Sequence, residues 1–399
     1  MSTTPFDRRR LQQPCEGRQL GRRAGEVVLT ASVTTATVSL VQPRGGRWGW
    51  VGCWCAAAIV TVAAVDASAA TAAGQSADGE LIDVGGGRRM YLECHGQGGP
   101  TVVFESGYPN DGTVWSRGGV FEAVAGFTRV CVYDRPGTLF EDHLSRSDAA
   151  PQPRTALDVV TDLHAGLQAA GEPGPYVFVA HSIGGLFVRL YASTYPDEVS
   201  GMVLVDSSSE DQVDRLKQII PPELFDSFVL ASQNPPADAI AAYPQLERIL
   251  IEESSNQVRA AMAQQPMRPM PLVVLTRGMP ASAEAALPPG ISADALDDVW
   301  EQLQRQLAQL VPGARQVIAT DSGHYIQLAQ PELVIDATRA VVDAVRRGET
   351  QLGPGGLADT GSASWVLVAV ASTLTALGVA LRAISPSPTA DGRRRTTCI

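Results

Sequence analysis

The sequence predicts an α/β fold in which a mostly parallel β-sheet is covered by helices on both faces. Between about residues 78 and 350, short apolar runs alternate with longer amphipathic segments. This alternation is typical of parallel strands joined by crossover helices. The interval from about 207 to 270 interrupts it, because it has no strand-like run and holds two or three helical segments. We therefore expect one α/β domain with a helical cap inserted between two of its strands.

The predicted strands are short apolar runs, most of them rich in β-branched residues. In chain order they cover residues 89–94, 101–105, 129–133, 176–180, 202–205, 272–275 and 316–319. The Val-Val-Phe run within 101–105 indicates a strand that is buried on both faces, as in a sheet between two helical layers.

The predicted helices lie between these strands and carry apolar residues at helical spacing. They cover residues 156–170, 185–194, 293–310 and 332–346. Thr155 and Asp158 have the spacing of a capping box at the start of the first helix. The face of that helix that we expect to be buried consists of Leu157, Val160, His164 and Leu167.

The charge of the chain argues against one class of function. The whole chain has a net charge of −11, and the body from 74 to 350 is more acidic still, because many of the Arg residues lie in the two terminal segments. An acidic body repels nucleic acids and anionic lipid surfaces. We therefore expect no nucleic-acid partner.

One segment of the body indicates a specific chemistry. At residues 176–185 an apolar Tyr-Val-Phe-Val-Ala run continues into His-Ser-Ile-Gly-Gly and then into the predicted helix 185–194. A serine at a sharp strand-to-helix turn presents its hydroxyl above the sheet, and the free N–H groups at the start of the helix face a developing oxyanion. Ser182 is therefore the predicted nucleophile, and Ala180 stands where glycine is usual.

Five segments resemble the α/β-hydrolase superfamily, in the branch of small esterases, prolyl aminopeptidase-like enzymes and cofactor-free haloperoxidases. They are Thr-Val-Val-Phe-Glu-Ser-Gly at 101–107, Tyr-Asp-Arg-Pro-Gly at 133–137, the serine turn, Val-Leu-Val-Asp at 203–206 and Asp-Ser-Gly-His at 321–324. The resemblance implies an eight-stranded, mostly parallel sheet and a small-molecule ester or amide substrate that is cleaved through an acyl-serine intermediate. It implies no cofactor and no metal.

The resemblance also implies roles for residues around the serine. The general base is expected on a loop after the last strand, and His324 is the only histidine that follows the serine. The oxyanion hole is expected to use the backbone N–H groups of Ile183 and Tyr108, where Ser-Gly-Tyr at 106–108 replaces the family's His-Gly-X. The segment 133–137 is interpreted as an architectural turn.

Two carboxylates are candidates for the acid that supports the base. Most of the family takes this acid from the turn after the seventh strand, here 272–275, and no carboxylate follows that strand until Glu284. A subset of the family takes it from the end of the sixth strand, where this sequence has Asp206. We predict that Asp206 is the acid and keep Glu284 as the alternative.

Only two of the cysteines, Cys94 and Cys131, lie in the body. In an exported domain they are candidates for one disulfide, and two unlinked core cysteines are the alternative. In the sheet of the family that the chain resembles, the strands that carry them are neighbours, which implies that the two are joined.

The N-terminal region has the parts of an export signal. Residues 1–47 are a basic extension that we expect to be disordered. Residues 48–65 carry no charge, and Ala-Ser-Ala and Ala-Thr-Ala follow them as cleavage patterns. We predict that 48–73 are a signal peptide or signal anchor and that the body lies outside the cytoplasm. A buried helix of the domain is the alternative.

The C-terminal region combines three features in a fixed order. Residues 351–362 are a Gly-rich linker with Leu-Ala-Asp-Thr-Gly at 357–361, residues 363–381 are an uncharged predicted membrane span, and residues 382–399 are a basic tail expected in the cytoplasm. The pentapeptide resembles the signal that sortases of actinobacteria, which are high-GC Gram-positive bacteria, cut between Thr360 and Gly361 before joining the protein to the cell wall. An ordinary membrane anchor is the alternative.

Three functions remain open at the level of the sequence. The first is a surface-exposed serine esterase. The second is a surface aminopeptidase, which needs a carboxylate to hold the substrate amine, and Glu252 and Glu253 of the predicted cap are candidates for it. The third is a non-catalytic surface protein with a hydrolase fold.

Overall fold

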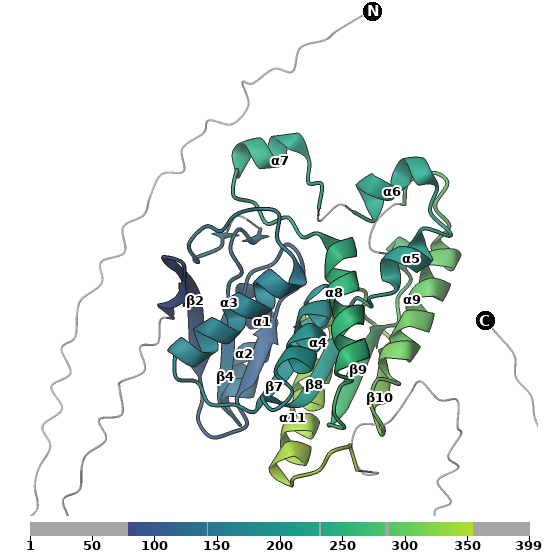
Figure 1. The fold of residues 1–399 in the computed structure, drawn as a ribbon. Coiled ribbons are helices and arrows are strands. Elements are labelled where there is room, and N and C mark those ends of the chain that lie inside the picture. Colours follow the sequence, from purple (N-terminus) through teal and green to yellow (C-terminus); the bar gives the residue numbers. More distant parts are fainter. Residues whose placement is uncertain (1–78, 142, 231–232, 284–286, 354–399) are drawn as a thin grey trace, which may run out of the picture. The chain divides into compact units, whose positions relative to one another are not determined.

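The computed structural model describes residues 79–141, 143–230, 233–283 and 287–353 (Figure 1). The predicted N-terminal extension, export signal, sortase pentapeptide, C-terminal span and basic tail lie outside these residues. Within the described ranges, no helix is both long enough and apolar enough to cross a membrane.

Eight strands form one sheet. Their order across it is β1 (Glu80–Gly85), β2 (Arg88–His95), β4 (Val130–Tyr133), β3 (Val102–Glu105), β7 (Tyr176–His181), β8 (Val199–Val205), β9 (Leu272–Arg277) and β10 (Arg315–Ala319). β2 runs antiparallel to β1 and β4, and the remaining neighbours are parallel. The predicted eight-stranded, mostly parallel sheet is confirmed.

Of the eight strands in this sheet, the sequence did not single out β1, which lies at one edge. Its residues are exposed or half-buried throughout, so it lacks the buried apolar run that marks the other strands. β1 joins β2 through a turn in which Gly85, Gly86 and Gly87 all have positive φ. Glycine adopts this conformation without steric cost, so these residues permit the tight reversal.

Two helical layers cover the sheet. One layer contains α3 (Ala156–Ala169), α4 (Gly184–Thr194), α8 (Ile251–Gln264) and α9 (Ala293–Leu307), and the other contains α1 (Thr113–Arg117), α2 (Val120–Ala125) and α11 (Pro331–Arg346). Figure 1 shows α3, α4 and α8 side by side in front of the sheet. Because alternate strand residues face opposite layers, Val103 lies in the core of the first layer and Val102 in that of the second.

Helix α3 begins as predicted, but its buried face differs from the prediction. Thr155 and Asp158 form the expected capping box. The buried side is centred on Leu163, whereas Leu157 is 48% exposed and His164 is only partly buried. Leu157 lies six residues before Leu163, which is roughly 120° around the helix. The predicted face shares Val160 and Leu167 with the buried side, and its other two residues lie toward the exposed side.

The interval between β8 and β9 is helical, as expected from its sequence. It contains α5 (Gln212–Leu216), α6 (Pro222–Phe228), α7 (Ala237–Ala242) and α8, and its described residues form no strand. Val258 of α8 lies in the core that α3 and α4 share, so this helix belongs to the layer on the sheet. Figure 1 shows α6 and α7 above the sheet, so these two helices match the expected cap better than α8 does.

Cys94 of β2 and Cys131 of β4 form a disulfide. The two residues face each other directly in the antiparallel pairing of these strands. The bond joins segments that are 37 residues apart in the chain.

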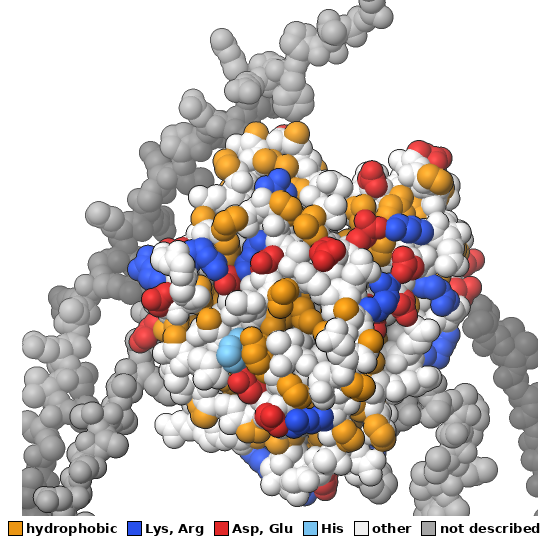
Figure 2. Space-filling model, viewed as in Figure 1, with side chains coloured by type: hydrophobic (Ala, Val, Ile, Leu, Met, Phe, Trp, Pro, Cys, Tyr) orange, Lys and Arg blue, Asp and Glu red, His pale blue; other side chains and the backbone are white. Residues whose placement is uncertain are grey.

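The surface carries charges of both signs. On the face seen in Figure 2, Asp and Glu side chains are interspersed with Lys and Arg, and no basic stripe crosses this face.

Candidate active site

Ser182 lies at the turn between β7 and α4, as the sequence predicts. It has a positive φ of 55°, which few non-glycine residues adopt. The turn is tight, because a Cβ added to Gly184 would lie 2.7 Å from Glu105 Cγ. A strained turn of this kind holds the serine side chain above the end of the sheet.

Three predicted residues from distant parts of the chain meet at this turn. His324 Nε2 lies 2.9 Å from Ser182 Oγ, and His324 Nδ1 lies 2.7 Å from Asp206 Oδ2. A carboxylate only accepts hydrogen bonds, so Nδ1 carries the proton and Nε2 accepts the hydrogen bond from the serine hydroxyl. His324 lies on the loop between β10 and α10 (Ile326–Ala329), and Asp206 directly follows β8.

Asp206 is fully buried and held by groups that the sequence did not point to. Its Oδ1 accepts a hydrogen bond of 2.7 Å from Trp300 Nε1 and one of 3.0 Å from the backbone N–H of Arg277. The Arg277 guanidinium lies 3.8 Å from its other oxygen and pairs with Asp297 at 2.6 Å. Arg277 ends β9, where most of the family has its acid, so here that strand end supports Asp206.

The loop after β3 provides the second side of the site. Ser106, which replaces the family's histidine, donates from Oγ to the Asp111 carbonyl at 2.9 Å and accepts from Trp115 Nε1 at 3.1 Å. A Cβ added to Gly107 would lie 2.9 Å from Ser182 Cβ, so only glycine lets the loop pass this close. The backbone N–H groups of Tyr108 and Ile183 donate to no other described residue and are available to a ligand.

His181 contributes to the site in a way that sequence reasoning missed. It is 1% exposed, and its Nε2 lies 2.9 Å from the His324 carbonyl oxygen, to which it donates. Burial, and secondarily the charge of His324, lower the pKa of His181 far below its ordinary value. A neutral His181 therefore fixes the loop that carries the candidate base.

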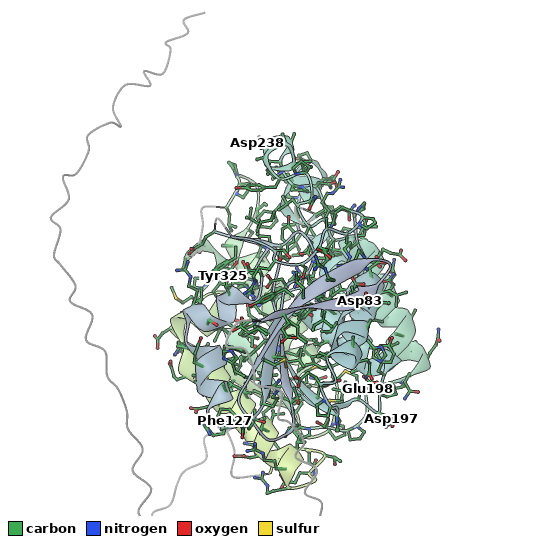
Figure 3. All side chains as sticks on the ribbon, turned by 90° about the vertical axis from the view of Figure 1, so that its left-hand side faces the viewer. Asp83, Phe127, Asp197, Glu198, Asp238 and Tyr325 are labelled. Atoms are coloured by element: carbon green, nitrogen blue, oxygen red, sulfur yellow. A yellow bond between two sulfur atoms is a disulfide. The ribbon has the colours of Figure 1, made fainter. Side chains whose placement is uncertain are left out.

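The base loop and the interval between β8 and β9 can be located in Figure 3. Tyr325, the residue after His324, lies between Asp238 of α7 at the top and Phe127 at the bottom. Phe127 precedes β4 and thus marks the amino ends of the parallel strands. Ser182, Asp206 and His324 follow the carboxyl ends of β7, β8 and β10, which is where open α/β sheets bind ligands.

Some predicted residues do not join this cluster or cannot be placed. Glu284, Thr360 and Gly361 lie outside the described residues. Glu252 and Glu253 line a cavity of about 410 Å³ between α5 and α8, and its lining includes none of the residues around Ser182. Glu252 also pairs with Lys217 there. Nothing in this arrangement directs the two carboxylates toward the serine.

Comparisons with known proteins agree with the fold. The family model for the alpha/beta hydrolase fold matches residues 100–245, which include Ser182 and Asp206. Together with the sheet order, this match shows that the chain has the fold of the α/β-hydrolase superfamily.

The relatives are distant. The chain is 26% identical over 307 residues to "Probable transporter efuK" of Hormonema carpetanum, covering 66% of this chain and 42% of that protein, so it spans less than half of that relative. It is 24% identical over 259 residues to an "AB hydrolase superfamily protein" of Gibberella zeae, covering 55% of this chain and 79% of that one. A solved thermophilic esterase from Thermogutta terrifontis has 21% identity and a TM-score of 0.42, covering 68% of this chain and 99% of that one.

Proposed function

We propose that the chain is a serine hydrolase that cleaves an ester bond through an acyl-Ser182 intermediate. The observation that carries the proposal is the continuous chain of contacts from Ser182 Oγ through His324 to the buried Asp206, at 2.9 and 2.7 Å. Nucleophile, base and acid in this order form the arrangement that activates a serine on several unrelated folds.

Each residue has one task in the proposed reaction. His324 Nε2 takes the proton of Ser182 as Oγ attacks the carbonyl carbon of the substrate, and Asp206 stabilises the imidazolium that forms. The N–H groups of Tyr108 and Ile183 bind the oxyanion of the tetrahedral intermediate. The imidazolium then protonates the departing alcohol, and a water molecule hydrolyses the acyl-serine by the same route.

The substrate class can be tested directly. A panel of p-nitrophenyl esters of increasing acyl length, run beside aminoacyl p-nitroanilides, separates an esterase from an aminopeptidase. We expect hydrolysis of the esters, because Glu252 and Glu253, the carboxylates considered for binding a substrate amine, line a cavity apart from the residues around Ser182. Faster cleavage of the anilides than of the esters would contradict this assignment.

We place the domain outside the cytoplasm. The Cys94–Cys131 disulfide supports this proposal, because structural disulfides persist in oxidising compartments and are rare in the cytosol. The apolar segments predicted from the sequence would deliver the domain there. Treatment of intact cells with a membrane-impermeant protease should degrade the domain, and full protection would contradict the proposal.

A further inference from the structure

A buried group of charges lies directly behind the loop that follows β3. Arg135 is 2% exposed, and the two carboxylates that pair with it, Glu105 and Glu247, are fully buried. Leaving a charge buried without partners is strongly destabilising, so a cluster of this kind holds its members in fixed positions. The sequence had suggested only an architectural turn at Arg135.

Arg135 makes hydrogen bonds to the loop itself. Its Nη1 donates to Glu105 Oε1 and to the Ser106 carbonyl, both at 2.7 Å, and its Nη2 donates to the Gly107 carbonyl at 3.1 Å. Two successive carbonyls of the loop therefore point at one guanidinium. The planar, forked arrangement of the guanidinium donors suits this task, and a lysine ammonium could not reproduce it.

The bond to Gly107 bears on the oxyanion hole. The Gly107 carbonyl and the Tyr108 N–H belong to the same peptide unit, which is planar, so that in the trans form the two groups point in opposite directions. Because Arg135 holds the Gly107 carbonyl toward itself, the Tyr108 N–H must point away from Arg135. Gly107 also lies against Ser182, because a Cβ added to it would be 2.9 Å from Ser182 Cβ.

The other side of the guanidinium belongs to the interval between β8 and β9. Arg135 Nε and Nη2 donate to Glu247 Oε1 and Oε2 at 2.8 and 2.9 Å, a bidentate pair. Glu247 lies in the segment between α7 and α8, and its backbone N–H donates to the Gly137 carbonyl at 2.8 Å. Side chain and backbone together attach this segment to the 133–137 turn.

We propose that Arg135 is a positioning residue for the oxyanion hole and that Glu247, which orients Arg135, makes the hole depend on the segment between α7 and α8. This inference rests on the proposed serine hydrolase function. Displacement of either residue tilts the Gly107–Tyr108 peptide away from the developing oxyanion. The loss falls on the transition state and leaves binding of the uncharged substrate almost unchanged.

The test compares Glu247→Gln and Arg135→Lys with Glu172→Gln. Glu172 forms a bidentate pair with Arg129, which precedes β4 and lies at the opposite end of the parallel strands. This control removes the same charge from another Arg–Glu pair, one that is partly buried and remote from Ser182. Measurements are kcat, KM, melting temperature, and inhibition by a trifluoromethyl ketone and a methyl ketone of the same acyl chain. Only the first ketone forms a stable oxyanion with the serine.

Loss of a whole oxyanion donor costs about 10²–10³ in kcat, so tilting one should cost about 10–100-fold. We expect Glu247→Gln to lower kcat by this factor, with KM changed less than about twofold. In Glu247→Gln, inhibition by the trifluoromethyl ketone should weaken by the same factor, while inhibition by the methyl ketone stays at the wild-type value. The control Glu172→Gln should keep the wild-type kcat. Arg135→Lys should act in the same direction and more strongly. If it does not fold, Glu247→Gln, which keeps the Arg135 side chain and removes only the charge of the carboxylate that orients it, still decides.

Two results would overturn the inference. One is a folded Glu247→Gln variant with wild-type kcat and trifluoromethyl ketone inhibition. The other is an equal loss of kcat in Glu172→Gln, since that indicates general destabilisation. Both results require an active wild-type chain. A wild-type chain without Ser182-dependent ester hydrolysis would instead overturn the proposed function itself, so the two failures are distinguishable.

Discussion

Backbone strain is concentrated at the residues proposed to react. Among the described non-glycine residues, positive φ occurs at Glu141, Ser182 and Asp206. Two of the three are the proposed nucleophile and acid, and each directly follows a strand. Such conformations cost of order 1–3 kcal/mol and persist where the surrounding structure enforces them. The sheet beneath them, rather than local preference, therefore holds these two residues in place.

The identity of the acid gives the first residue-level prediction. Asp206→Asn should lower kcat by about 10⁴, because an amide neither fixes the imidazole tautomer nor stabilises the imidazolium. Glu284→Gln should leave kcat within about twofold of wild type, since Asp206 already occupies His324 Nδ1. Steady-state kinetics on a p-nitrophenyl ester check both variants. The reverse pattern would assign the acid to Glu284.

A second residue-level prediction concerns stability and pH. Burial, opposed by Arg135 and the Tyr133 hydroxyl, raises the pKa of Glu105 from 4.5 to about 7. Between these values the folded chain keeps a proton that the unfolded chain releases, so this contribution to stability is complete below pH 4.5 and is lost as the pH rises through 7. The loss amounts to roughly 3 kcal/mol.

Glu105→Gln isolates this contribution, because glutamine cannot ionise. Urea unfolding of both proteins between pH 4.5 and 8 should show a steeper decline for the wild type than for the variant. Other titrating groups contribute equally to both curves. Parallel curves would mean that Glu105 ionises in the folded state as it does in the unfolded chain.

Sequence motifs located the proposed nucleophile, base and acid, but not the residues that hold them in place. Ser182, His324 and Asp206 each follow a strand in a recognisable local pattern, so a linear sequence is enough to nominate them. Trp300 lies on an amphipathic helix 94 residues after Asp206, and only the packing of that helix brings its indole N–H to the carboxylate. Glu247 is likewise 112 residues from Arg135 in sequence, and no local pattern links the two.

At the scale of elements, buried strands were predicted correctly, whereas half-exposed or short elements were not. The seven predicted strands are all present, because buried apolar runs are visible in the sequence. The half-exposed edge strand β1 and the short helices α1 and α2 lack such a signal. In α3 the helix was predicted, and its buried side was right at Val160 and Leu167 but wrong at Leu157, since that side is set by the sheet and by the neighbouring α4 and α8.

The disulfide gives a prediction for the β2–β4 pair. The bond closes a loop of 37 residues, and by loop-closure entropy it should stabilise the fold by roughly 3–4 kcal/mol. Cys94→Ala combined with Cys131→Ala should lower the free energy of unfolding by about that amount, measured by urea denaturation without reductant. Reductant should destabilise the wild type and leave the double variant unchanged. An equal response of both proteins to reductant would exclude the disulfide in solution.

At the scale of the whole molecule, the chain beyond the described residues is predicted to determine where the proposed hydrolase is displayed. If 357–361 are a sorting signal, a sortase joins Thr360 to the cell wall and the predicted span and tail are left behind. Muramidase should then release the enzyme, detergent alone should not, and Thr360→Ala should move it to the membrane fraction. Extraction of the full-length chain by detergent alone, with its C-terminal tail intact, would show an ordinary membrane anchor.

Covalent labelling shows whether Ser182 is an activated nucleophile. Incubation of the folded chain with a fluorophosphonate, followed by digestion and mass spectrometry, should find one adduct per chain, on Ser182. Ser182→Ala should take up no label and lose about 10⁶ of kcat while melting at the wild-type temperature. A folded wild-type chain that remains unlabelled, or that carries the adduct on another residue, would contradict the account.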